Sequence, residues 1–536
     1  MESPDIVLVF PQGGETIKVS HFPPHGLLAV AADIIEEYNV KLIDERVDSN
    51  SKSKLKSYIA LNPTCIAISV MTGQHITYAL ETAKYIRDLA GKSLPLVWGG
   101  VHATMLADQT LDNEYVDIIV RGDGEVTFKN LIKALKTGAD LRTVTGISFK
   151  DKEGNKIHNP DTKDFKLGEA RPAPWHLVNV EDYISDGSMF FGSDTKRMLD
   201  IGVTTKGCQH RCGFCYNLNF NKMYWRGMPA DKTFEFIKQC VDDFKLDSYM
   251  IHDDNYFVNP KRVNDVADLM IQDNMDVKWT STGITVYSYV RMEDEIKKKI
   301  VKSGCESFRF GIESGSPRII KLMNKPNTLE QVYDVNRDTK KHGIIPIYSW
   351  MIGFPTETKE DIMATCKLMI NLKKENDASQ YHGISIYTPY PGTPLYEMAK
   401  QHGFVPPDTF EGWSNVYWGS KLLEISLAEV PKKFLDDIQD LSYMNSDWFN
   451  YQAPKWLKVG FWPLFLWLKY RWEHQMFSNM FEVGMYRKLR KRYQENAFVP
   501  ELRAYRKIKN LIDQINFKTN KDKSNSEINK SKIPFS

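Results

Sequence analysis

The chain has 536 residues, of which 42% are hydrophobic and 26% charged, and its formal net charge is +2. This length allows two to four domains, and the composition is typical of a soluble globular protein. A charge so close to zero gives no general field that would attract nucleic acid. Seven cysteines, three of them clustered, indicate a reducing compartment rather than a disulfide scaffold. The acidic start runs straight into a strand pattern, and no run of ~20 apolar residues occurs, so we expect a cytoplasmic protein without a signal peptide or a membrane span.

Apolar strand-like runs alternate with helical patterns over residues 1–150, which predicts a parallel sheet built from β-α units. Helical spacing is found at His25–Tyr38 and Ile76–Leu89. The predicted strands are Ile6–Phe10, Val40–Ile43, Cys65–Val70, Leu94–Trp98 and Val116–Val120. In such sheets, ligands bind beyond the carboxyl ends of the strands.

Small and polar residues gather at those predicted strand ends. A glycine there permits a tight turn and lets the backbone approach a flat or phosphate-bearing ligand closely. Taken singly, each is more often a plain turn residue. The residues that we select as candidates are Gln12, Ser69, Thr72, Gly99, Gly100, His102, Gly122 and Glu125.

Together, VWGGVHAT at 97–104 and VDIIVRGDGEVTF at 116–128 resemble the cobalamin-binding domain that precedes many radical S-adenosylmethionine (SAM) domains. The segment FPPHGLLAVAADI at 22–34 is similar to the opening of the same family. This resemblance implies a Rossmann-like domain that binds cobalamin at the candidate residues. Many cobalamin domains carry D-x-H-x-x-G, whose histidine binds cobalt. Neither His21 nor His25 has that context, so we expect no histidine ligand on the cobalt; a domain without cofactor would show the same departure.

A polar and then proline-rich segment at 151–197 is predicted to be a linker. A second sheet is expected to begin at Met198–Thr204, and strand and helix patterns alternate from there to about Ala399. The length of 198–400 suits a partial (β/α)6 barrel, whose chemistry we expect at the carboxyl ends of its strands.

Cys208, Cys212 and Cys215 form a C-x₃-C-x₂-C run. One short loop can thereby place three thiolates around an iron–sulfur cluster, which takes four ligands when held by cysteine alone. Three ligands leave one iron open. The alternative is a zinc site, but structural zinc sites usually bring two spaced pairs of ligands, and no second pair exists here.

This run, including Phe214 before the last cysteine, resembles the cluster loop of the radical SAM superfamily. The resemblance implies a [4Fe-4S] cluster whose open iron chelates SAM, with release of a 5′-deoxyadenosyl radical. Later segments match the same family in order: YMIHDD at 249–254, FRFGIES at 308–314, WMIGFPTET at 350–358 and YTPYPGTPLY at 387–396. The resemblance implies SAM-binding roles for Phe214, Asp253, Asp254, Glu313, Ser314, Gly353 and Pro355.

From residue 401 to 516 the pattern becomes helical and rich in aromatic residues, and 517–536 has the composition of a disordered tail. Within residues 401–516, the segment Pro454–Trp472 combines Trp and Phe with flanking Lys and Arg. We favour a helix packed on the barrel mouth, which would bury Trp462 and Trp467. The alternative is an interfacial helix that makes peripheral contact with a membrane.

The family resemblance implies a cobalamin-dependent radical SAM enzyme that methylates an unactivated carbon, with the methyl group passing from methylcobalamin to a substrate radical. It also implies a flavodoxin or ferredoxin as electron donor. The runner-up is oxidative ring closure or rearrangement of a tetrapyrrole-like or lipid substrate. A non-enzyme alternative is a corrinoid-binding sensor or carrier. No general base stands out, and the aromatic tail favours a small-molecule substrate with a large apolar body.

Overall fold

The structure is a computed structural model. It describes residues 3–13, 22–162, 166–187, 195–416, 425–447, 449 and 462–496. Two compact units are distinguished, residues 1–475 and 476–536. Both large sheets belong to the first unit, and helix α20 (Phe481–Asn496) belongs to the second.

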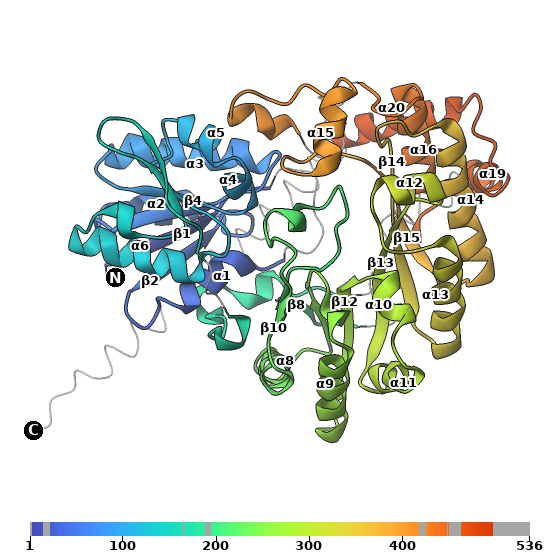
Figure 1. Cartoon of the computed structure of the whole chain (residues 1–536), viewed down its shortest axis with the longest axis horizontal. Coiled ribbons are helices and arrows are strands. Elements are labelled where there is room, and N and C mark those ends of the chain that lie inside the picture. Colours follow the sequence, from blue (N-terminus) through green and yellow to red (C-terminus); the bar gives the residue numbers. More distant parts are fainter. Residues whose placement is uncertain are drawn as a thin grey trace, which may run out of the picture. The chain divides into compact units, whose positions relative to one another are not determined.

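The first sheet has seven strands in the order β2-β1-β3-β4-β5-β6-β7. The strands are β1 (Ile6–Phe10), β2 (Val40–Asp44), β3 (Cys65–Ser69), β4 (Leu96–Gly99), β5 (Ile118–Val120), β6 (Ile147–Lys150) and β7 (Lys156–His158). The first five are parallel, and β6 and β7 add antiparallel. The helices, blue to cyan in Figure 1, are α1 (His25–Ala32), α2 (Ser51–Ile59), α3 (His75–Ala90), α4 (Val101–Met105), α5 (Ala107–Asp112) and α6 (Gly124–Thr137).

Strand β1 shows why this sheet is covered on both faces. Ile6 and Leu8 pack into one hydrophobic cluster, and Val7 and Val9 into another. Side chains of a strand alternate between faces, so a run that is apolar throughout needs helices on both sides. The α1 and α6 helices bury Leu27 and Leu131 in the first cluster, whereas α3 buries Ile76 in the second.

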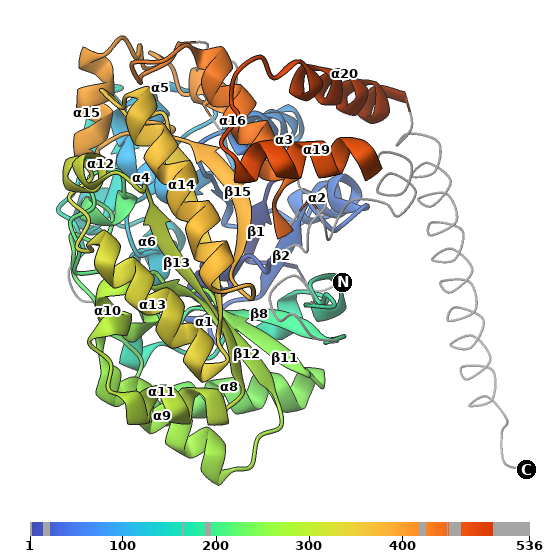
Figure 2. The same ribbon diagram turned by 90° about the vertical axis from the view of Figure 1, so that its right-hand side faces the viewer.

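The second large sheet has six parallel strands in the order β15-β14-β13-β12-β11-β8. They are β8 (Met198–Gly202), β11 (Ser248–Ile251), β12 (Lys278–Ile284), β13 (Cys305–Glu313), β14 (Ile345–Ile352) and β15 (Gln380–Ile386). Figure 2 shows helices that lie along this sheet, and in the chain these helices are found between successive strands. They are α8 (Ala230–Phe244), α9 (Pro260–Gln272), α10 (Val286–Val290), α11 (Asp294–Lys302), α12 (Pro317–Leu322), α13 (Leu329–His342) and α14 (Lys359–Glu375). Helix α15 (Pro394–Gln401) follows the last strand.

The predicted fold class, a Rossmann-like domain followed by a six-stranded partial barrel and helices, is confirmed. Differences are local. The β4 strand begins at Leu96 rather than Leu94, β5 begins at Ile118 rather than Val116, and α1 ends at Ala32, well before Tyr38. Strand β7 lies inside the expected linker, because Ser148 of β6 pairs with His158 and so extends the first sheet beyond residue 150.

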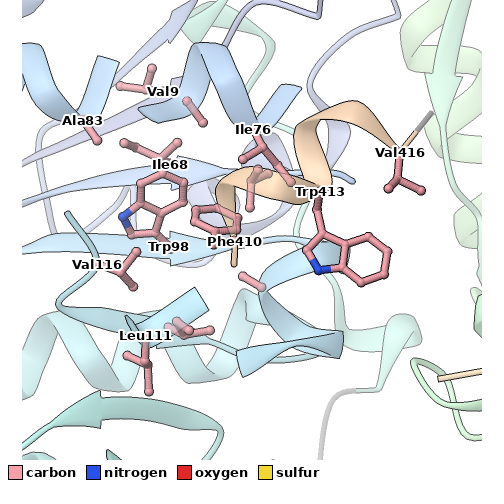
Figure 3. Close-up of a cluster of buried hydrophobic side chains, with 14 of the residues drawn as sticks. Val9, Ile68, Ile76, Ala83, Trp98, Leu111, Val116, Phe410, Trp413 and Val416 are labelled. Atoms are coloured by element: carbon pink, nitrogen blue, oxygen red, sulfur yellow. The ribbon is translucent and has the colours of Figure 1, made fainter. Parts of the chain in front are cut away.

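An aromatic segment after α15 packs against the first sheet, which the sequence patterns did not predict. Figure 3 shows Phe410 and Trp413 beside Trp98 of β4 and Ile76 of α3. The Phe410 and Trp98 rings lie 5.5 Å apart, and the Trp413 indole donates a hydrogen bond to the Gln109 side chain at 2.6 Å. This segment therefore completes the core on that face.

Two further helices of the first unit follow, α16 (Lys432–Met444) and α19 (Trp462–Glu473). The α19 helix contacts α16 and buries Leu468 and Trp472. Trp462 is 59% exposed and Trp467 is 41% exposed, so the expectation that both would be buried is wrong. Residues 454–461 of the aromatic segment lie outside the described residues. In the described part of the chain, no helix has the length and apolar character required to span a bilayer.

Candidate cluster, SAM and cobalamin site

The three cysteines lie on the loop between β9 (Thr205–Lys206) and a short 3-10 helix at Tyr216–Leu218. Strand β9 belongs to a two-stranded antiparallel sheet. All three thiols are half-buried and free. The amide of Cys215 donates to the carbonyl of Cys212 at 3.0 Å, which closes the turn between them. Gly213 is fixed on both sides, because its amide donates to Met323 O at 2.8 Å and its carbonyl accepts from the Leu395 amide at 3.0 Å. The loop is thus held by backbone hydrogen bonds, one within the loop and two to the segments at Met323 and Leu395.

Asp254 fixes the two ends of this loop. Its carboxylate accepts a hydrogen bond from the Gly207 amide at 2.8 Å and from the Tyr216 hydroxyl at 2.7 Å. Asp253, its neighbour after β11, is buried and accepts from the Thr204 amide at 2.6 Å and from the Thr205 hydroxyl at 2.8 Å. Burial raises the pKa of Asp253 to about 6. Both carboxylates position the cluster loop, and their contact with the SAM amino group stays a prediction.

The spacing of the thiols bears on the choice between zinc and a cluster. Among the described residues, three metal-ligating atoms all lie within 4.8 Å of one another only at Asp294, Asp338 and His342, so at least one pair of the cysteine sulfurs lies further apart than 4.8 Å. Sulfur atoms around one zinc ion, each 2.3 Å from the metal, would lie about 3.8 Å apart. The thiols as they stand are therefore not arranged around a single zinc ion. Burial raises the pKa of Cys215 to about 12, and binding of metal would therefore displace its proton.

Lys325, which the sequence patterns did not single out, lies beside the cluster loop. Its Nζ is 3.6 Å from the Glu313 carboxylate and 5.6 Å from the centre of the Phe214 ring. Burial raises the pKa of Glu313, although Lys325 opposes this rise. A lysine in a loop after a helix has no distinctive sequence signal, and its role becomes visible only when β13 and the loop are brought together.

Ser314 is turned into the protein. Its hydroxyl lies 3.1 Å from the Thr365 hydroxyl and accepts from the Ser316 amide at 3.1 Å. Glu313, one residue before it, has a positive φ of 71°. Such backbone geometry is uncommon outside glycine and is over-represented at functional sites. The structure thus separates the two neighbours: Glu313 lies beside Lys325 near the cluster loop, whereas Ser314 holds the turn.

The turn at Gly353 and Pro355 is closed by Glu357, a residue that we did not predict. The Glu357 carboxylate accepts hydrogen bonds from the amides of Gly353 at 2.5 Å and Phe354 at 3.1 Å. Burial raises the pKa of Glu357 to about 8. The Phe354 ring lies 6.5 Å from the Phe214 ring, so this turn reaches the cluster loop.

The strand ends of the first sheet bring several of the cobalamin candidates together. Ser69 pairs directly with Gly99 across β3 and β4. Gly100 has a φ of +94°, and a Cβ there would lie 2.5 Å from the Val70 carbonyl oxygen. Gly100 is thus required because two backbones meet. At Gly122, by contrast, a Cβ would contact nothing within 4 Å, although its φ of +70° also favours glycine.

Three other candidates make contacts inside the protein. His102 is fully buried, bonds the Thr72 hydroxyl at 2.9 Å and lies 5.3 Å from the Phe410 ring. Burial lowers the pKa of His102 to about 3, so the ring is neutral. The Gln12 side chain donates to the backbone carbonyl of Glu45. His102 therefore belongs to the core rather than to the open strand ends.

Glu125 joins the first domain to the hairpin that leads into the cluster loop. Lys206 of β9, two residues before Cys208, lies 2.5 Å from the Glu125 carboxylate and 3.1 Å from that of Asp123. Arg226 of β10 (Arg226–Gly227) also pairs with Asp123. Burial lowers the pKa of Lys206, but the two carboxylates raise this pKa by more than burial lowers it, so the net shift is upward. Removal of one partner of such a buried pair is strongly destabilising, because it leaves an uncompensated buried charge.

Of the two histidines considered as possible cobalt ligands, only His25 is among the described residues. His25 begins α1, and its Nε2 lies 3.0 Å from the Asp200 carboxylate of β8. His21 lies outside the described residues.

Two family models match this chain. Residues 203–369 match the model of the radical SAM superfamily, and residues 19–132 match the B12 binding domain. An uncharacterized methyltransferase of Pyrococcus horikoshii is 31% identical over 80% of this chain and 90% of its own length. The anaerobic magnesium-protoporphyrin IX monomethyl ester cyclase of Cereibacter sphaeroides is 26% identical over 67% of this chain and 57% of its own length.

A solved structure has the same fold. The radical SAM methyltransferase TsrM from Kitasatospora setae, with cobalamin and a [4Fe-4S] cluster bound, aligns with a TM-score of 0.60. The alignment covers 75% of this chain and 76% of that one at 17% identity. The chain belongs to the radical SAM enzymes that carry a B12-binding domain. Its cofactors are a [4Fe-4S] cluster, SAM and cobalamin.

Proposed function

We propose that this enzyme transfers a methyl group to an unactivated carbon of a small-molecule substrate. When bound, the cluster and SAM supply a carbon-centred radical, and cobalamin supplies the methyl group. The proposal is supported by the methyltransferase relative that matches 80% of the chain and by the presence of both cofactor domains.

The observation that carries the proposal is the ionic bridge between the two domains. Lys206 and Arg226 flank the cluster loop, and both pair with Asp123, which follows β5 at the strand ends of the first domain. Methyl transfer from cobalamin to a substrate radical requires the substrate to lie between the cobalamin and the SAM at the cluster, so the two cofactors must be held at a fixed separation. Reactive groups held in position gain rate through orientation. A bridge from the B12-binding domain to the strand before Cys208 provides this constraint.

The test uses anaerobically reconstituted enzyme, a small-molecule extract of the source organism, a reductant and SAM with a deuterated methyl group. We expect an extract compound to gain the deuterated methyl group with wild-type enzyme but not with the Cys208→Ala variant. A compound that changes mass without taking up deuterium would contradict methylation.

The second candidate is oxidative ring closure or rearrangement of a tetrapyrrole-like or lipid substrate. It is favoured by the similarity to the Cereibacter cyclase. In the same extract experiment, ring closure yields a product that has lost hydrogen and carries no deuterium. For either reaction, the electron donor that we propose is a flavodoxin or a ferredoxin.

The aromatic face of α19 is the basis for a proposed peripheral membrane contact. Trp462, Leu466, Trp467 and Tyr470 are all exposed, and Lys469 lies beside them on the helix. Interfacial helices combine such aromatic residues with basic ones. We expect the enzyme to float with anionic vesicles at low salt and to detach at high salt. The Trp462→Glu/Trp467→Glu variant should stay in the bottom fraction. Wild-type enzyme that stays there at low salt would contradict membrane contact.

A further inference from the structure

The face of the second sheet that lines the barrel interior carries a small cluster of apolar side chains, which we call the apolar floor. Met198 of β8, Met250 of β11 and Ile347 of β14 pack together, with Phe22 and Ile345 against them. Side chains two positions apart on a strand share a face. The residues two positions further along the chain, one on β8 and one directly after the end of β11, therefore face the same interior.

Those next positions are occupied by Asp200 and His252. Asp200 is 1% exposed, and its carboxylate is bonded by His252 Nδ1 at 2.8 Å, by His25 Nε2 at 3.0 Å and by the Gly202 amide at 2.9 Å. The His252 side chain is 46% exposed. Because its Nδ1 is held by Asp200, Nε2 is the nitrogen left to meet a ligand.

Arg309 faces the same interior from β13. It pairs directly with Ile347 of the apolar floor, and paired residues of parallel strands point to the same side. Across β12, Ser281 pairs with both Ile251 and Phe308, so His252 and Arg309 stand at the same height in the sheet. His382 of β15 follows Tyr381, which pairs with the outward-facing Tyr348, and so also points inward.

We propose that His252, Arg309 and His382 form a binding site for an anionic group of the substrate, a carboxylate or a phosphate. This inference rests on the proposed function, since it names the substrate class of the same barrel. A substrate with a large apolar body is compatible with this proposal, because only its anionic end would contact His252, Arg309 and His382. Arginine is suited to both anions, since its planar fork donates two parallel hydrogen bonds.

The electrostatics of the layer support an anion rather than a cation. Burial lowers the pKa of Arg309 to about 10 and, together with the Arg309 charge, lowers the pKa of His382 to about 3. Arg309 thus stays charged, and His382 stays neutral. Burial and Arg309 also lower the pKa of His252, but Asp200, with a small contribution from Asp253, raises it more, so the net shift is upward. The His25 ring, on the other side of Asp200, shares that carboxylate. Below its raised pKa, His252 adds a second positive charge beside Arg309.

The test is calorimetric titration of the reconstituted holoenzyme, loaded with cobalamin and SAM, with inorganic phosphate and separately with propionate at constant ionic strength. We expect saturable binding of at least one of the two anions, and the one bound identifies the group. In Arg309→Gln and in His252→Gln, affinity should fall about tenfold or more, as expected when a charged partner of an anion is lost. Binding should also weaken as the pH rises through the raised pKa of His252.

The matched control is Arg337→Gln, which removes an arginine charge from exposed α13, where it pairs with Asp334 and Glu375. Its affinity should equal that of wild type. No binding of either anion, or equal binding in wild type and Arg309→Gln, would overturn the proposal. Release of 5′-deoxyadenosine and methyl transfer are measured separately, so failure here is distinguishable from failure of the proposed function.

Discussion

Replacement of Cys208, Cys212 and Cys215 by Ala is expected to abolish bound iron, the brown absorbance of the cluster and cleavage of SAM. We expect the three half-buried thiols of the loop to be the cluster ligands, because an iron–sulfur cluster is held by thiolates. Because Asp254, Gly213 and the neighbouring backbone fix the loop independently, the variant should keep its fold. Iron and sulfide content, with circular dichroism as the folding check, measure this.

The matched control replaces Cys240, Cys305 and Cys366 by Ala. These thiols are buried in α8, β13 and α14, away from the cluster loop, so none is expected to ligate the cluster. The control should keep the iron of the wild type at some cost in stability, since each change removes a buried sulfur atom. Retention of iron in the first variant, or its loss in the control alone, would contradict the assignment.

Gly99→Phe is expected to weaken cobalamin binding by about tenfold or more, because a large side chain at the strand ends would occupy the space that a flat ligand needs. Gly99 ends β4 opposite Ser69. A Cβ there would make a single ordinary contact, 3.7 Å from the Val120 carbonyl oxygen. Gly99→Ala is thus the matched control and should bind cobalamin like wild type.

The neighbouring Gly100 is not a suitable position for this test. Any side chain there would collide with the Val70 backbone and would disturb β3 whether or not cobalamin binds nearby. Binding is measured by absorbance of the cobalamin that stays with the protein after gel filtration. Equal retention by Gly99→Phe and wild type would show that the cofactor lies elsewhere.

The alternation of strands and helices could be predicted from sequence because apolar runs such as Ile6–Phe10 and Cys65–Ser69 are short, bounded by turns and buried on both faces. The cluster loop could be predicted because three cysteines lie within eight residues. Helix α1 was predicted too long, because residues 33–37 continue the apolar pattern but form turns.

The side-chain contacts of the site could not be predicted, since they join residues far apart in the chain. Glu125 is a strand-end residue by pattern, yet it pairs with Lys206, 81 residues later. His102 follows two glycines at a strand end, yet it is buried against Phe410. The bond between His25 and Asp200 spans 175 residues. Local periodicity carries no information on such pairings, which depend on how the two sheets are assembled.

Radical chemistry on SAM underlies both of the proposed reactions of this enzyme. Its most direct test is the release of 5′-deoxyadenosine from SAM by the anaerobically reconstituted enzyme under a low-potential reductant, measured by chromatography and mass spectrometry. We expect release by wild type and none by the variant that lacks Cys208, Cys212 and Cys215. A wild-type enzyme that holds a full cluster and binds SAM, but releases no 5′-deoxyadenosine, would contradict both proposed reactions.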